Sequence, residues 1–223
     1  MNKTILVSIR QLFFTAATLL LATNAMAAPQ LQPPEIEVEK ITRNLLDLYD
    51  KNEEKYRKDR EGFVQEVDRM LSPVVAFDQI ARYVMGKYTR RSPGQVDKFE
   101  TTFKDSLLRF YSNALLALDD TSLTIESVDK TPEKQLKEYI AGDISRIPVK
   151  MSVRTSTRSV DIFYSMVHTD GRWKLRNITI DGINIAKQFQ TQFADAVDRY
   201  GKVETVVANW AEIMQGKDIK AGK

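Results

Sequence analysis

The stretch from Ile147 to Ile183 constrains the fold more than any other part of the chain, because its pattern predicts three consecutive strands. In its first part, from residue 147 to 154, every second residue is apolar: Ile147, Val149, Met151 and Val153. Such period-two alternation is typical of a strand with one buried and one hydrated face. The next run, from Ser159 to Thr169, is rich in β-branched and aromatic residues, and its apolar side chains fall on both faces.

One Asp-Gly pair follows the second predicted strand and another follows the third. Asp170-Gly171 is a two-residue hairpin signal, because a type I′ turn needs a positive φ at both of its central residues. Trp173 to Ile180 is the expected returning strand, and Asp181-Gly182 ends it and starts a helix. The three strands predict a curved antiparallel sheet whose apolar face must be covered by helices.

Apolar residues at helical spacing predict helices on both sides of this sheet in the sequence. The expected helices cover residues 36–56, 63–71, 74–85 and 94–118 before the sheet, and 184–200 and 203–214 after it. Ser72-Pro73 and Ser92-Pro93 predict two of the helix starts, because Ser favours the N-cap and Pro the first helical position. A first strand is expected around 123–128, a polar loop at 131–137, and a short strand or turn at 139–144. This order of elements predicts the α+β class.

The first 27 residues have the three parts of a secretory signal peptide. Lys3 and Arg10 form the basic region, Leu12 to Ala22 the apolar region, and Ala25-Met26-Ala27 an A-x-A cleavage site. The apolar region is too short for a transmembrane helix. We therefore predict an exported chain with a single α+β domain at 28–215 and a tail at 216–223. The domain divides into a helical part at about 35–118, a sheet part at about 121–183 and C-terminal helices at 184–214.

Composition argues against several functions. The chain has 33 Lys plus Arg against 30 Asp plus Glu, and removal of residues 1–27 leaves 31 basic side chains and a net charge of about +1. This balance lacks the basic bias of nucleic-acid-binding proteins. The chain has no Cys and one His, which argues against a zinc site. It carries no nucleotide-binding or hydrolase motif, and Asp119, Asp120, Asp161 and Asp181 are most simply turn or cap residues.

The segment FDQIARYVMGKY, from Phe77 to Tyr88, resembles the helix-to-glycine segment of the MlaC family, also called the toluene-tolerance Ttg2 family. The resemblance continues in order and covers nearly the whole predicted mature chain. It includes Phe99, Phe103, Leu107 and Tyr111 in a long helix, Tyr164 in a strand, Trp173-Lys174-Leu175, the turn Asp181-Gly182-Ile183-Asn184, and Phe193. Asn177, Asn184 and Gln190 stand where the family often has other residues.

The resemblance implies a periplasmic phospholipid-binding protein. Its sheet would be similar to that of nuclear transport factor two, with a helical layer and an apolar cavity between them. Members of the family shuttle lipid between an outer-membrane lipoprotein component and an inner-membrane ABC transporter component with an MCE domain. The resemblance thus implies a monomeric carrier with phospholipid as ligand, no cofactor, no metal, no nucleic acid and no catalytic activity.

Two other functions stay open from the residues alone. Sheets of this kind also serve isomerase-like or dehydratase-like enzymes that use a carboxylate or His deep inside the fold. The apolar faces could equally fill an ordinary core in a domain that binds a non-lipid partner, because periodicity does not distinguish a filled core from a cavity.

Under the carrier hypothesis, the lipid-binding side chains are apolar residues of the long helix, the strands and the helices next to them. The candidates are Val84, Phe103, Leu107, Tyr111, Val149, Met151, Val153, Ile162, Tyr164, Met166, Trp173, Leu175 and Phe189. Lys87, Arg90 and Arg91, between two predicted helices, are the candidates for contact with the headgroup.

Overall fold

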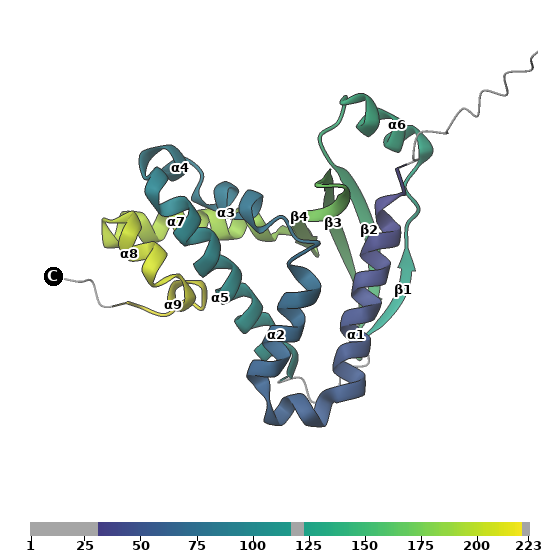
Figure 1. Cartoon of the computed structure of the whole chain (residues 1–223), viewed down its shortest axis with the longest axis horizontal. Coiled ribbons are helices and arrows are strands. Elements are labelled where there is room, and N and C mark those ends of the chain that lie inside the picture. Colours follow the sequence, from purple (N-terminus) through teal and green to yellow (C-terminus); the bar gives the residue numbers. More distant parts are fainter. Residues whose placement is uncertain (1–30, 117–122, 220–223) are drawn as a thin grey trace, which may run out of the picture. The chain divides into compact units, whose positions relative to one another are not determined.

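A computed structural model of the chain describes residues 31–116 and 123–219 (Figure 1). The predicted signal peptide, Leu118, Asp119 and Asp120 lie outside these residues. The helices before the sheet are α1 (Pro34–Lys58), α2 (Arg60–Leu71), α3 (Phe77–Met85), α4 (Tyr88–Arg91), the 3-10 helix η1 (Pro93–Gln95) and α5 (Val96–Leu116). Those within or after it are α6 (Glu133–Ala141), α7 (Ile185–Tyr200), α8 (Val203–Ala208) and α9 (Trp210–Met214). In the described part of the chain, no helix is both long and apolar enough to span a membrane.

The sheet is an antiparallel meander, with strand order β1-β2-β3-β4-β5. Its strands are β1 (Thr124–Val128), β2 (Ile147–Arg154), β3 (Ser159–Thr169), β4 (Arg172–Ile180) and β5 (Ile183–Asn184). Asp170 and Gly171 have φ values of 52° and 75°, as the predicted hairpin between β3 and β4 requires. The predicted α+β class, with a sheet covered by helices, is confirmed.

Three local predictions are wrong. Ser72-Pro73 does not start a helix, because Ser72 caps α2, residues 72–74 form a turn, and Val75 then makes a single bridge with Leu175 of β4 before α3 begins. Residues 133–141 form the helix α6 where a polar loop and a short strand or turn were expected, and only the turn at Gly142 is present. Charged pairs such as Glu133 with Lys137, 2.7 Å apart, support this helix, none of whose residues is fully buried. The last helix is divided into α8 and α9 at Asn209.

One face of the sheet is apolar and faces α1; we call it the inner face. It contains the alternating residues of β2 that the sequence predicted to be buried, all of them 8% exposed or less. In the register, Val149 lies opposite Tyr164, and Met151 lies opposite Ile162. Helix α1 contacts β1 and β2, as Figure 1 shows. Burial raises the pKa of the Tyr164 hydroxyl, and a hydrogen bond with Thr42 of α1 partly opposes the shift.

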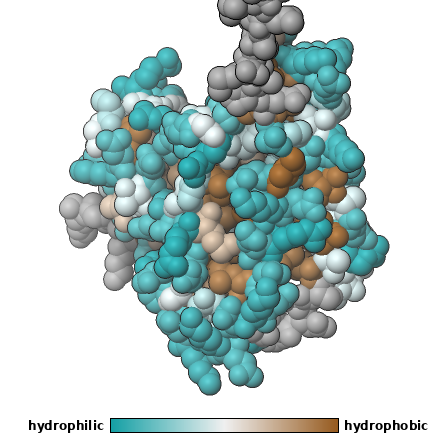
Figure 2. All heavy atoms as spheres, turned by 45° about the vertical axis from the view of Figure 1, so that its right-hand side comes forward, coloured by the Kyte–Doolittle hydropathy of each residue, from teal (hydrophilic) through white to brown (hydrophobic). Residues whose placement is uncertain are grey.

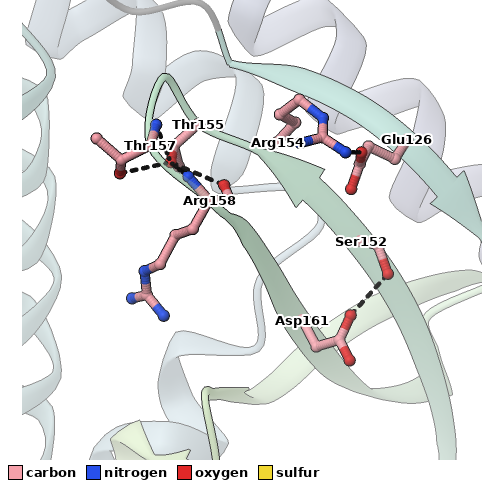
Figure 3. A network of polar contacts seen from close by, with 7 residues as sticks. All are labelled: Glu126, Ser152, Arg154, Thr155, Thr157, Arg158 and Asp161. Atoms are coloured by element: carbon pink, nitrogen blue, oxygen red, sulfur yellow. Dashed lines mark hydrogen bonds and ion pairs between the residues drawn. The ribbon is translucent and has the colours of Figure 1, made fainter.

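The opposite, outer face of the sheet is polar. Figure 3 shows Ser152 of β2 and Asp161 of β3 pointing toward each other, and the Ser152 hydroxyl donates to the carboxylate at 2.7 Å. Lys150 lies 2.9 Å from the same carboxylate. The hydrogen bond from Ser152 and the one from Lys150 together hold the pKa of Asp161 below its usual range. Polar side chains on this face allow it to meet water.

The helices hold two apolar clusters. The first surrounds Trp210 of α9, whose ring centre lies 5.2 Å from that of Phe99 and 5.7 Å from that of Phe193. The second joins α1, α2 and the end of α5 around Phe63. Leu107 of α5 packs against both clusters. The buried side chains of β2 belong to neither of these two clusters.

Candidate functional site

An apolar pocket of about 270 Å³ lies between β4 and the helices α3, α5 and α7. From β4 it is lined by Leu175, Asn177, Ile178 and Ile180. From the helices it is lined by Ile80 of α3, Phe103 and Tyr111 of α5, and Ile185, Ala186 and Phe189 of α7. Only the Asn177 amide and the Tyr111 hydroxyl bring polar side-chain groups to this lining. The pocket can therefore hold apolar chains but offers few directed hydrogen bonds.

A bulge in β4 makes its side of the pocket apolar. With regular alternation, Leu175 and Ile178 would lie on opposite faces of the sheet. The register instead places Leu175 opposite Met166 and Ile178 opposite Tyr164, with a shift between Ser165 and Met166. One extra residue on β4 therefore brings both side chains to the inner face.

Three hydrogen bonds hold the helices at this bulged strand. The Leu175 amide donates to the Val74 carbonyl at 2.7 Å, and the Ala76 amide donates back to the Leu175 carbonyl at 2.9 Å. On the other side, the Ala186 amide donates to the Asn177 side-chain oxygen at 3.1 Å. These bonds fix the starts of α3 and α7 against β4, so the pocket has a defined frame.

The three positions where this chain departs from the family pattern all make hydrogen bonds near the pocket. Asn177 holds the first turn of α7, as described above. Asn184 is the N-cap of α7 and accepts from the Lys187 amide at 2.9 Å. The Gln190 side chain donates to the Tyr83 carbonyl at 2.7 Å and so ties α7 to the end of α3.

The structure brings together part of the predicted lipid-binding set. Phe103, Tyr111, Leu175 and Phe189 line the apolar pocket. Leu107 lies one turn of α5 from Phe103 and Tyr111 and packs between the two helical clusters.

Two more predicted residues are neighbours of the lining, because Ile162 pairs with Ile180 and Tyr164 with Ile178. Ile178 and Ile180 were not predicted, since strict alternation from Trp173 and Leu175 assigns them to the opposite face of the strand. An irregularity in the strand pattern at Arg176-Asn177 is the signal that could have found them.

The other predicted residues lie elsewhere. Val84 is buried in the cluster around Trp210. Val149, Met151, Val153 and Met166 are buried on the inner face but do not line the apolar pocket. Trp173 is also buried, and its indole donates to the Gln32 carbonyl at 2.6 Å.

The predicted headgroup residues are near α4. Lys87 precedes this helix and lies over the Tyr88 ring, with its amino nitrogen 5.1 Å from the ring centre. Arg90 and Arg91 are in α4, and all three basic side chains are exposed. None of them lines the apolar pocket. Their role in headgroup contact stays a prediction.

A wider groove adjoins the apolar pocket across the side chains of Tyr111 and Phe189, which line both. The groove has a volume of about 670 Å³ and runs between the end of α5 and α7. Phe110 and Tyr111 on its wall are 39% and 50% exposed. Large aromatic groups thus reach solvent beside the pocket.

Figure 2 brings the right-hand side of Figure 1 forward and shows a mostly hydrophilic surface with hydrophobic residues near the middle of the face in view.

The two described carboxylates that were predicted to be turn or cap residues both have basic partners. Asp181 does lie in the turn after β4, 2.7 Å from Arg158, whereas Asp161 lies within β3 and pairs with Lys150 on the outer face. Within residues 31–116 and 123–219, no group of three or more His, Cys, Asp or Glu side chains could hold a metal ion. Among the described residues that line the apolar pocket, none carries a carboxylate or an imidazole.

Comparisons with known proteins agree with one another. The family model for MlaC protein matches residues 39–212. The Toluene tolerance protein ttg2D of Pseudomonas putida is 34% identical over 203 residues, which cover 89% of each chain. A phospholipid-binding protein from Ralstonia solanacearum, solved in complex with a phospholipid, is similar in fold. Its TM-score is 0.67 at 20% identity, and the match covers 83% of this chain and 98% of that one.

Proposed function

Because this chain belongs to the MlaC family, we propose that it is a periplasmic phospholipid carrier. The observation that carries the proposal is the apolar pocket between β4 and the helices, in a chain whose family and fold both include lipid-binding proteins. The carrier receives phospholipid at one membrane and delivers it at the other. Its expected partners are an outer-membrane lipoprotein component and the MCE-domain component of an inner-membrane ABC transporter.

The energetics of lipid transfer explain why a carrier needs such a pocket. Two acyl chains of about 15 methylenes gain roughly 24 kcal/mol gross when they leave water. A shallow polar groove cannot offset that, so lipid would stay in the membrane. A lining of Leu, Ile and Phe side chains replaces most of the membrane's apolar environment.

The pocket must widen to accept a whole phospholipid. Its volume of about 270 Å³ lies below the roughly 300–1,000 Å³ typical of sites for drug-sized ligands. Tyr111 and Phe189 separate it from the adjoining groove, so rotation of these two side chains would join the two spaces.

Lipid extraction tests the proposal directly. The protein is purified from the periplasm without detergent, and bound lipid is measured by native mass spectrometry and by solvent extraction. We expect phospholipid in stoichiometric amount. Protein that carries no lipid, and takes up none from phospholipid vesicles, would favour the alternative of a partner-binding domain with a filled core. Turnover of a small carbonyl substrate, lost on substitution of a pocket residue, would favour the enzyme alternative.

A further inference from the structure

A second pocket, of about 290 Å³, lies at the outer face of the sheet and is basic. We call it the arginine pocket, because Arg146 and Arg176 both line it. Arg146 comes directly before β2, and Arg176 is at the bulge of β4. Ser165 and Thr179 add hydroxyl groups from the outer face. The bulge that points the Ile178 side chain into the apolar pocket thus also places Arg176 in the arginine pocket.

The two guanidinium groups have no carboxylate partner among the described residues, and no acidic side chain lines this pocket. Other arginines near the outer face are paired, Arg154 with Glu126 and Arg158 with Asp181. Two guanidinium groups in one concavity therefore leave a positive site with donors in a planar fork, which suits a phosphate or carboxylate.

Two amide side chains add further donors. The Asn177 oxygen accepts from the Ala186 amide, and the Asn184 oxygen accepts from the Lys187 amide. Both asparagines line the arginine pocket. Because their oxygens are already used, each keeps its NH₂ group as a donor for a ligand. The pocket therefore offers guanidinium, amide and hydroxyl donors to one anion.

The arginine pocket and the apolar pocket meet at Asn177 and Ala186, which line both. The hydrogen bond of 3.1 Å between these residues forms the boundary. A molecule with apolar chains on one side of this boundary and an anionic group on the other would match both pockets. A phospholipid has this composition.

We propose that Arg146 and Arg176 bind a phosphate group, and that in the carrier this is the phosphodiester of the lipid whose acyl chains occupy the apolar pocket. That the phosphate belongs to a lipid rests on the proposed carrier function. That the two arginines bind a phosphate group does not. It differs from the headgroup contact predicted at Lys87, Arg90 and Arg91, none of which lines either pocket.

The test compares two double variants with equal loss of charge. Arg146→Gln/Arg176→Gln removes the arginine pocket's cations, and Arg90→Gln/Arg91→Gln removes two exposed cations on α4. Each is titrated with dihexanoyl-phosphatidylglycerol, with dihexanoylglycerol, which has the same chains and no phosphate, and with inorganic phosphate alone. Binding is followed by NMR chemical shifts, and circular dichroism checks that both variants fold.

We expect wild-type protein to prefer the phospholipid over the diacylglycerol by about ten- to 100-fold, since charge-assisted hydrogen bonds have this strength. Arg146→Gln/Arg176→Gln should lose the preference and keep its diacylglycerol affinity, whereas Arg90→Gln/Arg91→Gln should keep both. An unchanged preference in the first variant, or an equal loss in both, would overturn the proposal.

The same titrations distinguish failure of the phosphate site from failure of the carrier function. Binding of both lipids without a headgroup preference would leave the carrier function intact and refute the phosphate site. Binding of inorganic phosphate that depends on Arg146 and Arg176, without binding of either lipid, would support the phosphate site and refute the carrier function. Failure of wild-type protein to bind any of the three ligands would refute both.

Discussion

The substitution Ile178→Asp tests the apolar pocket at a residue that the strand pattern alone assigned to the wrong face. Ile178 lines the pocket and lies opposite Tyr164 on the inner face. It is partly exposed, so a carboxylate at this position stays hydrated in the folded chain. A lipid tail in the pocket would displace that water and leave the carboxylate unpaired among apolar side chains.

The expected loss of affinity follows from two contributions. Burial of an Ile side chain is worth about 1.5–3 kcal/mol, and burial of a polar group without a partner costs roughly 2–7 kcal/mol. Even the lower values, partly offset by residual hydration, predict a loss of at least about 3 kcal/mol, or more than roughly 100-fold in affinity. The effect on folding should be smaller, because the side chain retains contact with solvent.

Phospholipid content is measured by mass spectrometry after solvent extraction, and the melting temperature is measured in parallel. Two controls accompany the variant. Ile178→Val keeps the pocket apolar, and Ser156→Asp adds the same charge at an exposed residue between β2 and β3. Both should retain lipid. A folded Ile178→Asp protein with wild-type lipid content would refute the assignment of this pocket. Met151→Asp is a poorer test, because Met151 is 0% exposed and a buried charge there would disrupt the fold.

Three further predictions concern stability, each measured by urea unfolding. Trp210→Ala should lower the free energy of unfolding by about 3–5 kcal/mol, since Trp210 is fully buried among phenylalanine rings; a loss below about 1 kcal/mol would contradict this packing. Gly171→Ala should lower the free energy of unfolding by about 1 kcal/mol, because φ is 75° and the added Cβ has space but a strained backbone. Gly94→Ala is the control and should be close to neutral, because Gly94 is equally open and has no positive φ. Asp161 has a lowered pKa when folded, so its carboxylate stabilises the protein above the ordinary pKa of about 3.9, and this contribution disappears as the pH falls through the lower folded value. Asp161→Asn should therefore be less stable than wild type at pH 7, with a gap that closes in strong acid; a gap independent of pH would exclude the ion pair as its cause.

Local chemistry in the sequence determined most of the elements. The alternation from Ile147 to Val153 identified both β2 and its buried face, because neighbouring side chains of a strand point in opposite directions. Asp170-Gly171 identified the hairpin, since few other residue pairs accept two positive φ values. The spacing of Phe99, Phe103 and Leu107 identified the apolar stripe of α5. Each of these signals depends only on residues within a few positions of one another.

The tertiary structure decided where the cavity lies. Ile178 and Ile180 reach the inner face through a bulge that depends on the pairing of β4 with β3, and no pattern within β4 alone specifies it. Val74 and Ala76 exchange backbone hydrogen bonds with Leu175 of β4, so α3 starts only at Phe77 despite the helix signal of Ser72-Pro73. Arg146 and Arg176, 30 positions apart, share a pocket for the same reason. Side-chain identity sets the local geometry, but strand register is a property of two chain segments together, and the pockets follow the register.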